Sequence, residues 1–140
     1  MIKYKRLPAN IEDLMPMALK YLQTRPYIMF AYLFGSFGRG KHLPLSDVDV
    51  AVYLKDPSDI QEEKMEILGT LIDILQTDEI DLVVLNRAPL PLRMRILENK
   101  KVIVDRETFR RHHYESLTMR KYFDFSILEK QILNRRFLSG

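Results

Sequence analysis

Cysteine is absent from this 140-residue chain. Its absence excludes disulfide frameworks, zinc sites built on thiolates and catalytic cysteine nucleophiles. The chain also lacks a run of about 18 apolar residues, so no membrane-spanning helix is expected. The basic residues at its start, 1–6, have no apolar stretch behind them and do not resemble a secretory signal. We therefore expect a cytoplasmic protein with no membrane partner.

A strong excess of charge of one sign is missing too. The formal net charge is only +3, which does not by itself indicate a nucleic-acid-binding protein. Hydrophobic residues make up 46% of the chain, enough for an ordinary buried core. At this length we expect a single domain over residues 1–140, with a C-terminal helical segment at about residues 105–137.

Apolar residues recur along the chain with helical and strand periods in turn. Helices are predicted in four segments: residues 11–23, 57–76, 89–99 and 105–136. Strands are predicted in four others: residues 28–34, 47–54, 80–85 and 101–104. The order predicts a mixed α and β (α/β or α+β) domain in which a small mixed sheet is flanked by helices.

Capping residues predict where three of the helices begin. Pro16 fits badly inside a helix, so the first helix is expected to begin late, with Asp13 as its cap. Ser58 is expected to cap the second helix, with Gln61 three residues on as in a capping box. Asp105 is expected to cap the long C-terminal helix.

A glycine-rich turn, GSFGRG at residues 35–40, directly follows the first apolar strand. Glycines let the backbone turn sharply and bring main-chain N–H groups close to a ligand, which suits phosphate oxygens. Ser36 adds a hydroxyl donor and Arg39 adds a permanent positive charge. The glycine spacing is that of neither a dinucleotide-binding fold nor a P-loop. Taken alone, the turn favours a plain structural role.

Two carboxylates follow in the next strand. Asp47 and Asp49 are two residues apart, so their side chains point to the same face. Neighbouring carboxylates repel each other unless a cation screens them, and Mg²⁺ commonly bridges protein carboxylates to substrate phosphates. Read singly, Asp47 is a turn or cap residue and Asp49 is an outward-facing acid on a half-exposed strand.

A third acid, Asp81, lies in an otherwise apolar strand. An acid there is costly unless it is paired, exposed at a sheet edge or bound to metal. If its strand lies beside that of Asp47 and Asp49, three carboxylates converge and could hold two metal ions. The alternative is a strand-start residue near solvent. The joint occurrence of the glycine turn and the three acids favours a functional site.

These motifs together resemble the DNA polymerase β-type nucleotidyltransferase superfamily. The matching residues are 35–36 (GS), 39–40 (RG), 46–49 (SDVD) and Asp81. Within that superfamily the chain resembles the minimal nucleotidyltransferases, or MNT proteins, which are the antitoxins of HEPN/MNT toxin–antitoxin pairs. By motif the resemblance covers residues 28–85, and by length and element order the whole chain. It implies a polymerase-β-like nucleotidyltransferase fold.

The resemblance also implies how a nucleotide is held. Gly35 and Ser36 would bind the terminal phosphates of ATP, and Arg39 would support the phosphates or the turn. The family often has alanine where this chain has Gly38, a difference expected to loosen the turn without removing a ligand.

The metal site is likewise implied by the resemblance. Asp47 and Asp49 would ligate two Mg²⁺ ions, and Asp81 would ligate the catalytic one. Asp81 could also accept the proton of the attacking hydroxyl as a general base. Because all three acids and the serine are present, we expect an active enzyme.

The activity implied is transfer of AMP from ATP to a hydroxyl. In the MNT branch the acceptor is a tyrosine of a partner HEPN ribonuclease toxin, in a complex of the two proteins, and nucleic acid is not a direct substrate. Two alternatives stay open. One is a nucleotidyltransferase acting on a small molecule or an RNA end, against which the lack of an obvious second domain counts. The other is a non-catalytic antitoxin that neutralises its toxin by contact.

The predicted C-terminal helix is rich in both basic and apolar residues. Its apolar residues outnumber those that a single helix face needs for packing. We therefore expect part of this helix to pack on the sheet and part to meet a partner. A second protein and another copy of the chain are both open, and RNA is less favoured because the residues follow a helix period.

Overall fold

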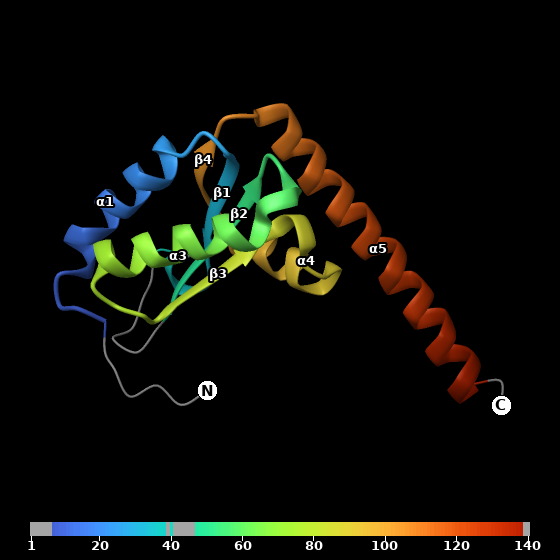
Figure 1. Cartoon of the computed structure of the whole chain (residues 1–140). Coiled ribbons are helices and arrows are strands. Elements are labelled where there is room, and N and C mark those ends of the chain that lie inside the picture. Colours follow the sequence, from blue (N-terminus) through green and yellow to red (C-terminus); the bar gives the residue numbers. More distant parts are fainter. Residues whose placement is uncertain (1–6, 39, 41–46, 139–140) are drawn as a thin grey trace.

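The computed structural model describes residues 7–38, 40 and 47–138 (Figure 1). The helical elements are α1 (Ile11–Thr24), α2 (Gly35–Gly38), η1 (Pro57–Asp59), α3 (Ile60–Leu75), η2 (Leu85–Arg87), α4 (Leu90–Glu98) and α5 (Thr108–Leu138). The strands are β1 (Ile28–Phe34), β2 (Val48–Leu54), β3 (Ile80–Val84) and β4 (Lys101–Asp105).

A four-stranded sheet in the order β3-β2-β1-β4 forms the centre of the molecule. β1 pairs antiparallel with β2 and with β4, whereas β2 pairs parallel with β3. α1 and α3 pack on one face of the sheet, and α4 and the start of α5 pack on the other (Figure 1). The predicted fold class, a small mixed sheet flanked by helices, is therefore confirmed.

β1 explains why the sequence shows a continuous apolar run. All seven of its residues, Ile28–Phe34, are buried. Leu33 belongs to the core under α1 and α3, whereas Phe30 and Tyr32 belong to the core under α4 and α5. A strand covered on both faces needs apolar side chains at every position, so no alternation is visible in its sequence.

α1 begins earlier than its proline suggested. The helix starts at Ile11, and Pro16 lies inside it, so the prediction of a late start capped by Asp13 is wrong. Ile11 and Met15 are both buried against the core, together with Ala18 further along the helix. This packing keeps the first turns helical although Pro16 has no N–H to donate to the preceding turn.

The start of α3 also differs from the prediction. Asp56 accepts a hydrogen bond of 2.9 Å from the main-chain N–H of Ser58, and the chain then makes the 3₁₀ turn η1. α3 itself begins at Ile60, and Asp59 at the cap position makes no side-chain capping bond. The prediction of Ser58 as the cap is therefore wrong, because Ser58 is the residue that Asp56 caps.

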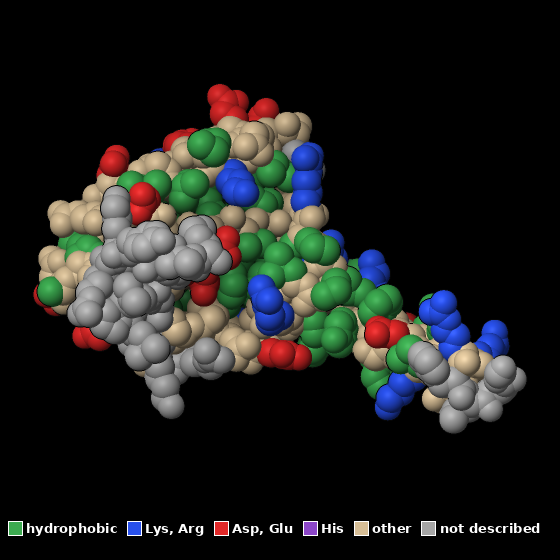
Figure 2. Space-filling model, turned by 90° about the horizontal axis from the view of Figure 1, so that it is seen from below, with side chains coloured by type: hydrophobic (Ala, Val, Ile, Leu, Met, Phe, Trp, Pro, Cys, Tyr) green, Lys and Arg blue, Asp and Glu red, His purple; other side chains and the backbone are tan. Residues whose placement is uncertain are grey.

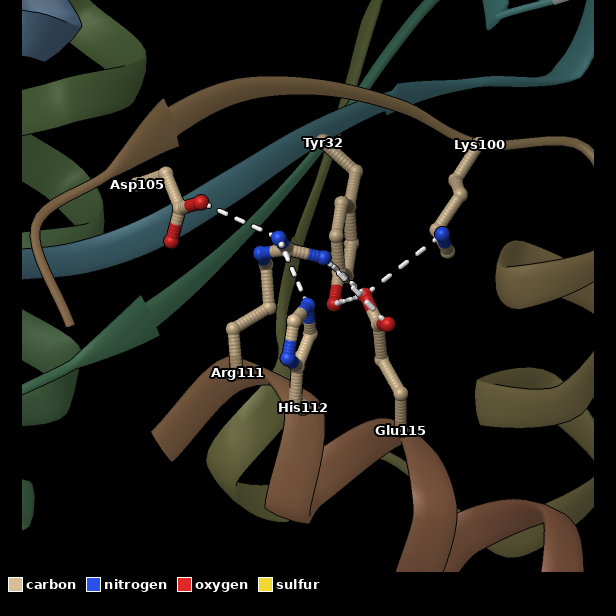
Figure 3. Close-up of polar contacts among 6 residues, drawn as sticks. All are labelled: Tyr32, Lys100, Asp105, Arg111, His112 and Glu115. Carbon is tan, nitrogen blue, oxygen red and sulfur yellow. Dashed lines mark hydrogen bonds and ion pairs between the residues drawn. The ribbon is translucent and has the colours of Figure 1, made fainter. Parts of the chain in front are cut away.

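α5 is anchored to the sheet by a polar network (Figure 3). The hydroxyl of Tyr32 on β1 donates to Glu115 on α5 at 2.7 Å. Arg111 donates to Glu115 at 3.1 Å and to Asp105 at 3.0 Å, and the ammonium group of Lys100 lies 3.5 Å from Glu115. Asp105 thus ends β4 and holds Arg111. It lies three residues before the start of α5 at Thr108, so it does not occupy the cap position that was predicted.

The C-terminal part of α5 projects from the body of the molecule (Figure 1). Apolar side chains follow this projecting part, with basic side chains between them (Figure 2). We call this projecting part, from Met119 to the end of α5 at Leu138, the α5 arm. Its exposed large apolar residues are Met119, Phe123, Phe125, Ile127, Leu128, Ile132 and Leu133. Even so, among the described residues no helix combines the length and the apolar character needed to cross a membrane.

Candidate active site

The three predicted acids lie at one end of the two parallel strands. Asp49 on β2 and Asp81 on β3 are register partners, and Asp47 immediately precedes β2. Register partners, and residues two apart on a strand, present their side chains on the same face of a sheet. All three acids line a single cleft of about 380 Å³. The strand of Asp81 therefore lies beside that of Asp49, which is the condition for the three carboxylates to converge.

The surroundings of the acids differ. Asp47 and Asp49 are half-buried, whereas Asp81 is exposed, because β3 is an edge strand of the sheet. Asp81 thus carries no burial cost that a metal or partner would have to offset. What distinguishes it from an ordinary strand-start acid is its position across from Asp49 in the same cleft.

The glycine turn is fitted against one of these carboxylates. Gly35 opens the short helix α2 with a φ of 62°, in the left-handed region that favours glycine. A Cβ atom on Gly35 would collide with the carboxylate of Asp49. The absence of a side chain at Gly35 therefore lets the end of β1 pass directly over Asp49. Ser36, the next residue of α2, is half-buried.

Gly38 closes α2 and is also required by close packing. A Cβ atom there would collide with the main-chain carbonyl oxygen of Asn99 and would lie 2.8 Å from that of Leu33. Our expectation that glycine merely loosens the turn is therefore wrong. The backbone of this chain approaches too closely at Gly38 to admit the alanine that the family often has.

Arg95 and Asn99 line the same cleft from α4 and the residue after it. The guanidinium of Arg95 makes no hydrogen bond or ion pair with any residue that the structure describes. Nothing in the sequence singles out Arg95, because its place in the cleft depends on how α4 packs against the sheet. Arg39, by contrast, lies outside the described residues, so of the predicted phosphate-binding residues only Gly35 and Ser36 are placed.

The donor set suits a hard cation that is shared with a phosphate. Mg²⁺ prefers oxygen ligands, keeps several waters, and is usually bound through one or two carboxylates together with substrate phosphates. Asp47, Asp49 and Asp81 offer such oxygens in one cleft. Within the described ranges, no three Asp, Glu or His side chains form a group that could hold a metal ion by themselves. The chemistry of the three acids therefore suits a Mg²⁺ ion that is shared with a phosphate.

Comparison with known proteins finds one matching family model. Residues 18–109 match the family model described as polymerase beta, nucleotidyltransferase. A search of curated proteins finds no match.

Solved structures of toxin–antitoxin complexes share the fold. A chain from a crystal structure of a mutant MntA-HpeT toxin–antitoxin is 24% identical, with a TM-score of 0.68, and the match covers 88% of this chain and 94% of that one. A toxin–antitoxin structure with AMP-PNP has the same identity and TM-score, with 88% and 95% covered.

A third structure is of a tri-AMPylated HEPN toxin from Shewanella oneidensis in complex with an MNT antitoxin, at 22% identity and a TM-score of 0.63, with 89% of this chain and 93% of that one covered. At such identities the likeness shows the fold alone. The family model, however, spans more than half of the chain and includes Gly35, Ser36 and all three acids. The chain therefore belongs to the family of polymerase β-type nucleotidyltransferases.

Proposed function

We propose that this chain is a Mg²⁺-dependent protein adenylyltransferase that transfers AMP from ATP to a tyrosine of a cognate HEPN toxin and thereby acts as its antitoxin. The observation that carries the proposal is the cleft in which Asp47, Asp49 and Asp81 meet the glycine turn at Gly35. The choice of substrate is supported by the solved neighbours, one with AMP-PNP and one with a tri-AMPylated HEPN toxin.

The acids hold the reacting end of the nucleotide. Asp47, Asp49 and Asp81 are the residues that would ligate Mg²⁺, which when bound neutralises phosphate charge and orients the phosphate for in-line displacement. Asp81 also accepts the proton of the acceptor hydroxyl, because it is exposed at the sheet edge where an acceptor can reach it. The hydroxyl oxygen bonds to the α-phosphorus, the bond from that phosphorus to the bridging oxygen breaks, and pyrophosphate leaves.

The rest of the cleft binds the phosphates. Ser36 and the main-chain N–H groups of the turn that begins at Gly35 donate hydrogen bonds to the β- and γ-phosphates. Arg95, which has no anionic partner among the described residues, supplies a positive charge from the α4 side of the cleft. A guanidinium suits this role because it remains charged and can bind phosphate oxygens in a bidentate manner.

The α5 arm offers this chain a surface for docking onto the toxin. It is remote from the core, and large apolar side chains such as Phe123 remain exposed along it. Exposed apolar surface of this extent marks interaction sites in soluble proteins. The solved neighbours are themselves complexes of a toxin with an antitoxin, which supports a protein partner.

The test combines the purified chain with the HEPN-type protein encoded by the neighbouring gene, ATP and Mg²⁺. We expect the mass of the partner to rise by one or more AMP units and its ribonuclease activity to fall. A partner whose mass does not change rules out the proposed acceptor. Removal of the metal with EDTA should abolish the gain in mass, and excess Mg²⁺ should restore it.

Neutralisation by contact alone is the second candidate, and the exposed apolar surface of the α5 arm favours it. The double variant Asp47→Asn, Asp49→Asn separates the two functions. We expect it to lose AMP transfer by at least about 100-fold, because removal of one electrostatic contact in an active site commonly costs that much. If the variant still silences the toxin, contact is the mechanism and transfer is not.

A further inference from the structure

A second cleft, of about 370 Å³, lies along β3. Its walls come from the start of α3, from the start of α4 and from β3 itself. Of the described residues, Asp81 alone lines both this cleft and the carboxylate cleft. A group bound along β3 would therefore end at the residue to which we assign the proton transfer.

The main chain of β3 is open on the side that faces this second cleft. The main-chain N–H of Val48 donates to the carbonyl oxygen of Glu79 at 3.0 Å. In a parallel ladder that starts in this way, Asp81 and Val83 turn their main-chain groups towards β2. The main-chain groups of Leu82 and Val84 therefore point away from β2, where the sheet order places no further strand among the described residues.

In the part of the chain that the structure describes, this edge has neither a bulge nor a proline, two features that usually prevent strand pairing. Bulges, prolines and inward-pointing charges protect most exposed edges. The pairings of β1 with β2 and with β4 each contain a register shift, whereas β3 pairs with β2 in an unbroken register. Leu82 and Val84 are buried beneath the edge, and Asp81 is the only charged residue of the strand. The edge is thus regular, and no described strand pairs with its outer side.

We propose that the β3 edge binds the acceptor protein, which adds an extended segment as a fifth strand and so brings its hydroxyl side chain to Asp81. Main-chain bonding of this kind is a common mode of peptide recognition. Lys64 of α3 and Arg87 of η2 line the cleft beside the strand, so the segment that fits has acidic residues opposite these two side chains. The inference rests on the proposed function and narrows its substrate to an extended acidic polypeptide segment.

The first test compares variants that alter this cleft and leave the carboxylate cleft intact. Gln61→Trp places a bulky ring in the second cleft, and Lys64→Glu reverses the charge of one residue that lines it. Each should raise KM for the cognate toxin by about tenfold or more, equivalent to a loss of about 1.4 kcal/mol, and leave KM for ATP unchanged. Glu62→Trp and Lys55→Glu are the matched controls, since both residues are exposed and neither lines the cleft. Normal KM values in Gln61→Trp and Lys64→Glu would overturn the inference.

The second test needs no catalysis. Hydrogen–deuterium exchange is measured on the full chain with and without the toxin, and we expect new protection of the amides of Leu82 and Val84. β4, the other edge strand, is the internal control and should not change. AMP transfer without protection of β3 would overturn the proposed binding of the acceptor at the β3 edge and would leave the proposed function standing. Protection of β3 without AMP transfer would support the β3 edge as a docking site and would overturn the proposed transferase function.

Discussion

The hydroxyl of Tyr32 donates a hydrogen bond of 2.7 Å to the carboxylate of Glu115, which joins the central strand β1 to α5 across 83 residues of sequence. Glu115 is only 8% exposed. Burial alone would raise the pKa of Glu115, but the hydrogen bonds from Tyr32 and Arg111 outweigh it and hold that pKa below its ordinary value. The network in Figure 3 therefore keeps a buried charge in place and fixes α5 on the sheet.

Replacing Glu115 by glutamine should weaken this junction. Glu115→Gln keeps an acceptor for Tyr32 but removes the charge that Arg111 and Lys100 contact. We expect the free energy of unfolding, measured by urea denaturation, to fall by about 1.5–3 kcal/mol, as for the loss of hydrogen bonds to a charged group. Glu129→Gln on the exposed α5 arm is the control and should change it by less than about 0.5 kcal/mol. Equal effects of the two changes would show that the network does not stabilise the fold.

The same network predicts that the stability of the fold depends on pH. Because the folded-state pKa of Glu115 lies below the unfolded value, its contribution to stability is present above the unfolded pKa of about 4.3 and is lost as the pH falls through the folded pKa. Urea titrations of the wild type and of Glu115→Gln from pH 7 to pH 3 should therefore converge at the acid end. A difference that stays constant down to pH 3 would contradict this assignment.

Gly38 offers a prediction with an internal control in the same chain. A Cβ atom at Gly38 collides with the carbonyl oxygen of Asn99, so Gly38→Ala should destabilise the fold by about 1–3 kcal/mol through overpacking. Gly69 lies within α3 with nothing near its Cβ position, so Gly69→Ala should stabilise the fold by about 0.5–1 kcal/mol. Thermal and urea unfolding measure both changes. A stable Gly38→Ala protein would mean that α2 can move away from Asn99.

Much of the fold follows from local pattern, whereas helix starts depend on packing. The predicted bounds of β1, residues 28–34, match the structure because both of its faces are buried. The starts of α1 and α3 were predicted wrongly. In α1 the burial of Ile11 outweighed the helix-breaking effect of Pro16, and before α3 the capping hydrogen bond is made by Asp56 and not by Ser58. Capping patterns report only local preferences, and tertiary contacts can override them.

In the candidate site, too, some features follow from the sequence and others only from the packing of the folded chain. The i, i+2 spacing of Asp47 and Asp49 predicted a shared face, and the parallel pairing of β2 with β3 brings Asp81 to it. Nothing in the sequence placed Arg95 in that cleft, because α4 meets the end of the sheet only in the folded chain. The second cleft along β3 was equally invisible, since the sequence shows a strand but not its position at an edge.

Arg95 is the next residue to test, through nucleotide affinity. Because its guanidinium lines the cleft without an anionic partner among the described residues, Arg95→Gln should raise the Kd for AMP-PNP with Mg²⁺ by about tenfold or more. Affinity for AMP should change little if Arg95 binds the β- and γ-phosphates, and should fall in parallel if it binds the α-phosphate. Titration calorimetry measures both. Arg110→Gln on α5 is the control, and an unchanged Kd for AMP-PNP in Arg95→Gln would remove Arg95 from the site.

The α5 arm can be tested separately from the chemistry. Phe123 is 64% exposed on the arm, so Phe123→Asp should leave the stability of the fold within about 0.5 kcal/mol of the wild type and leave nucleotide affinity unchanged. If the arm docks onto the toxin, loss of a central aromatic contact should weaken the complex by about 30-fold or more, as at interface hot spots.

Phe109→Asp is the matched control for this change, because Phe109 is 86% exposed at the start of the same helix, before the arm begins. Calorimetry of each variant with the toxin measures the affinity of the complex, and size-exclusion chromatography shows whether the complex forms. A complex weakened equally by both variants would reflect the added negative charge and not the arm. A complex that tolerates Phe123→Asp but not Gln61→Trp would place the main contact at the β3 edge, whereas the opposite result would place it on the α5 arm.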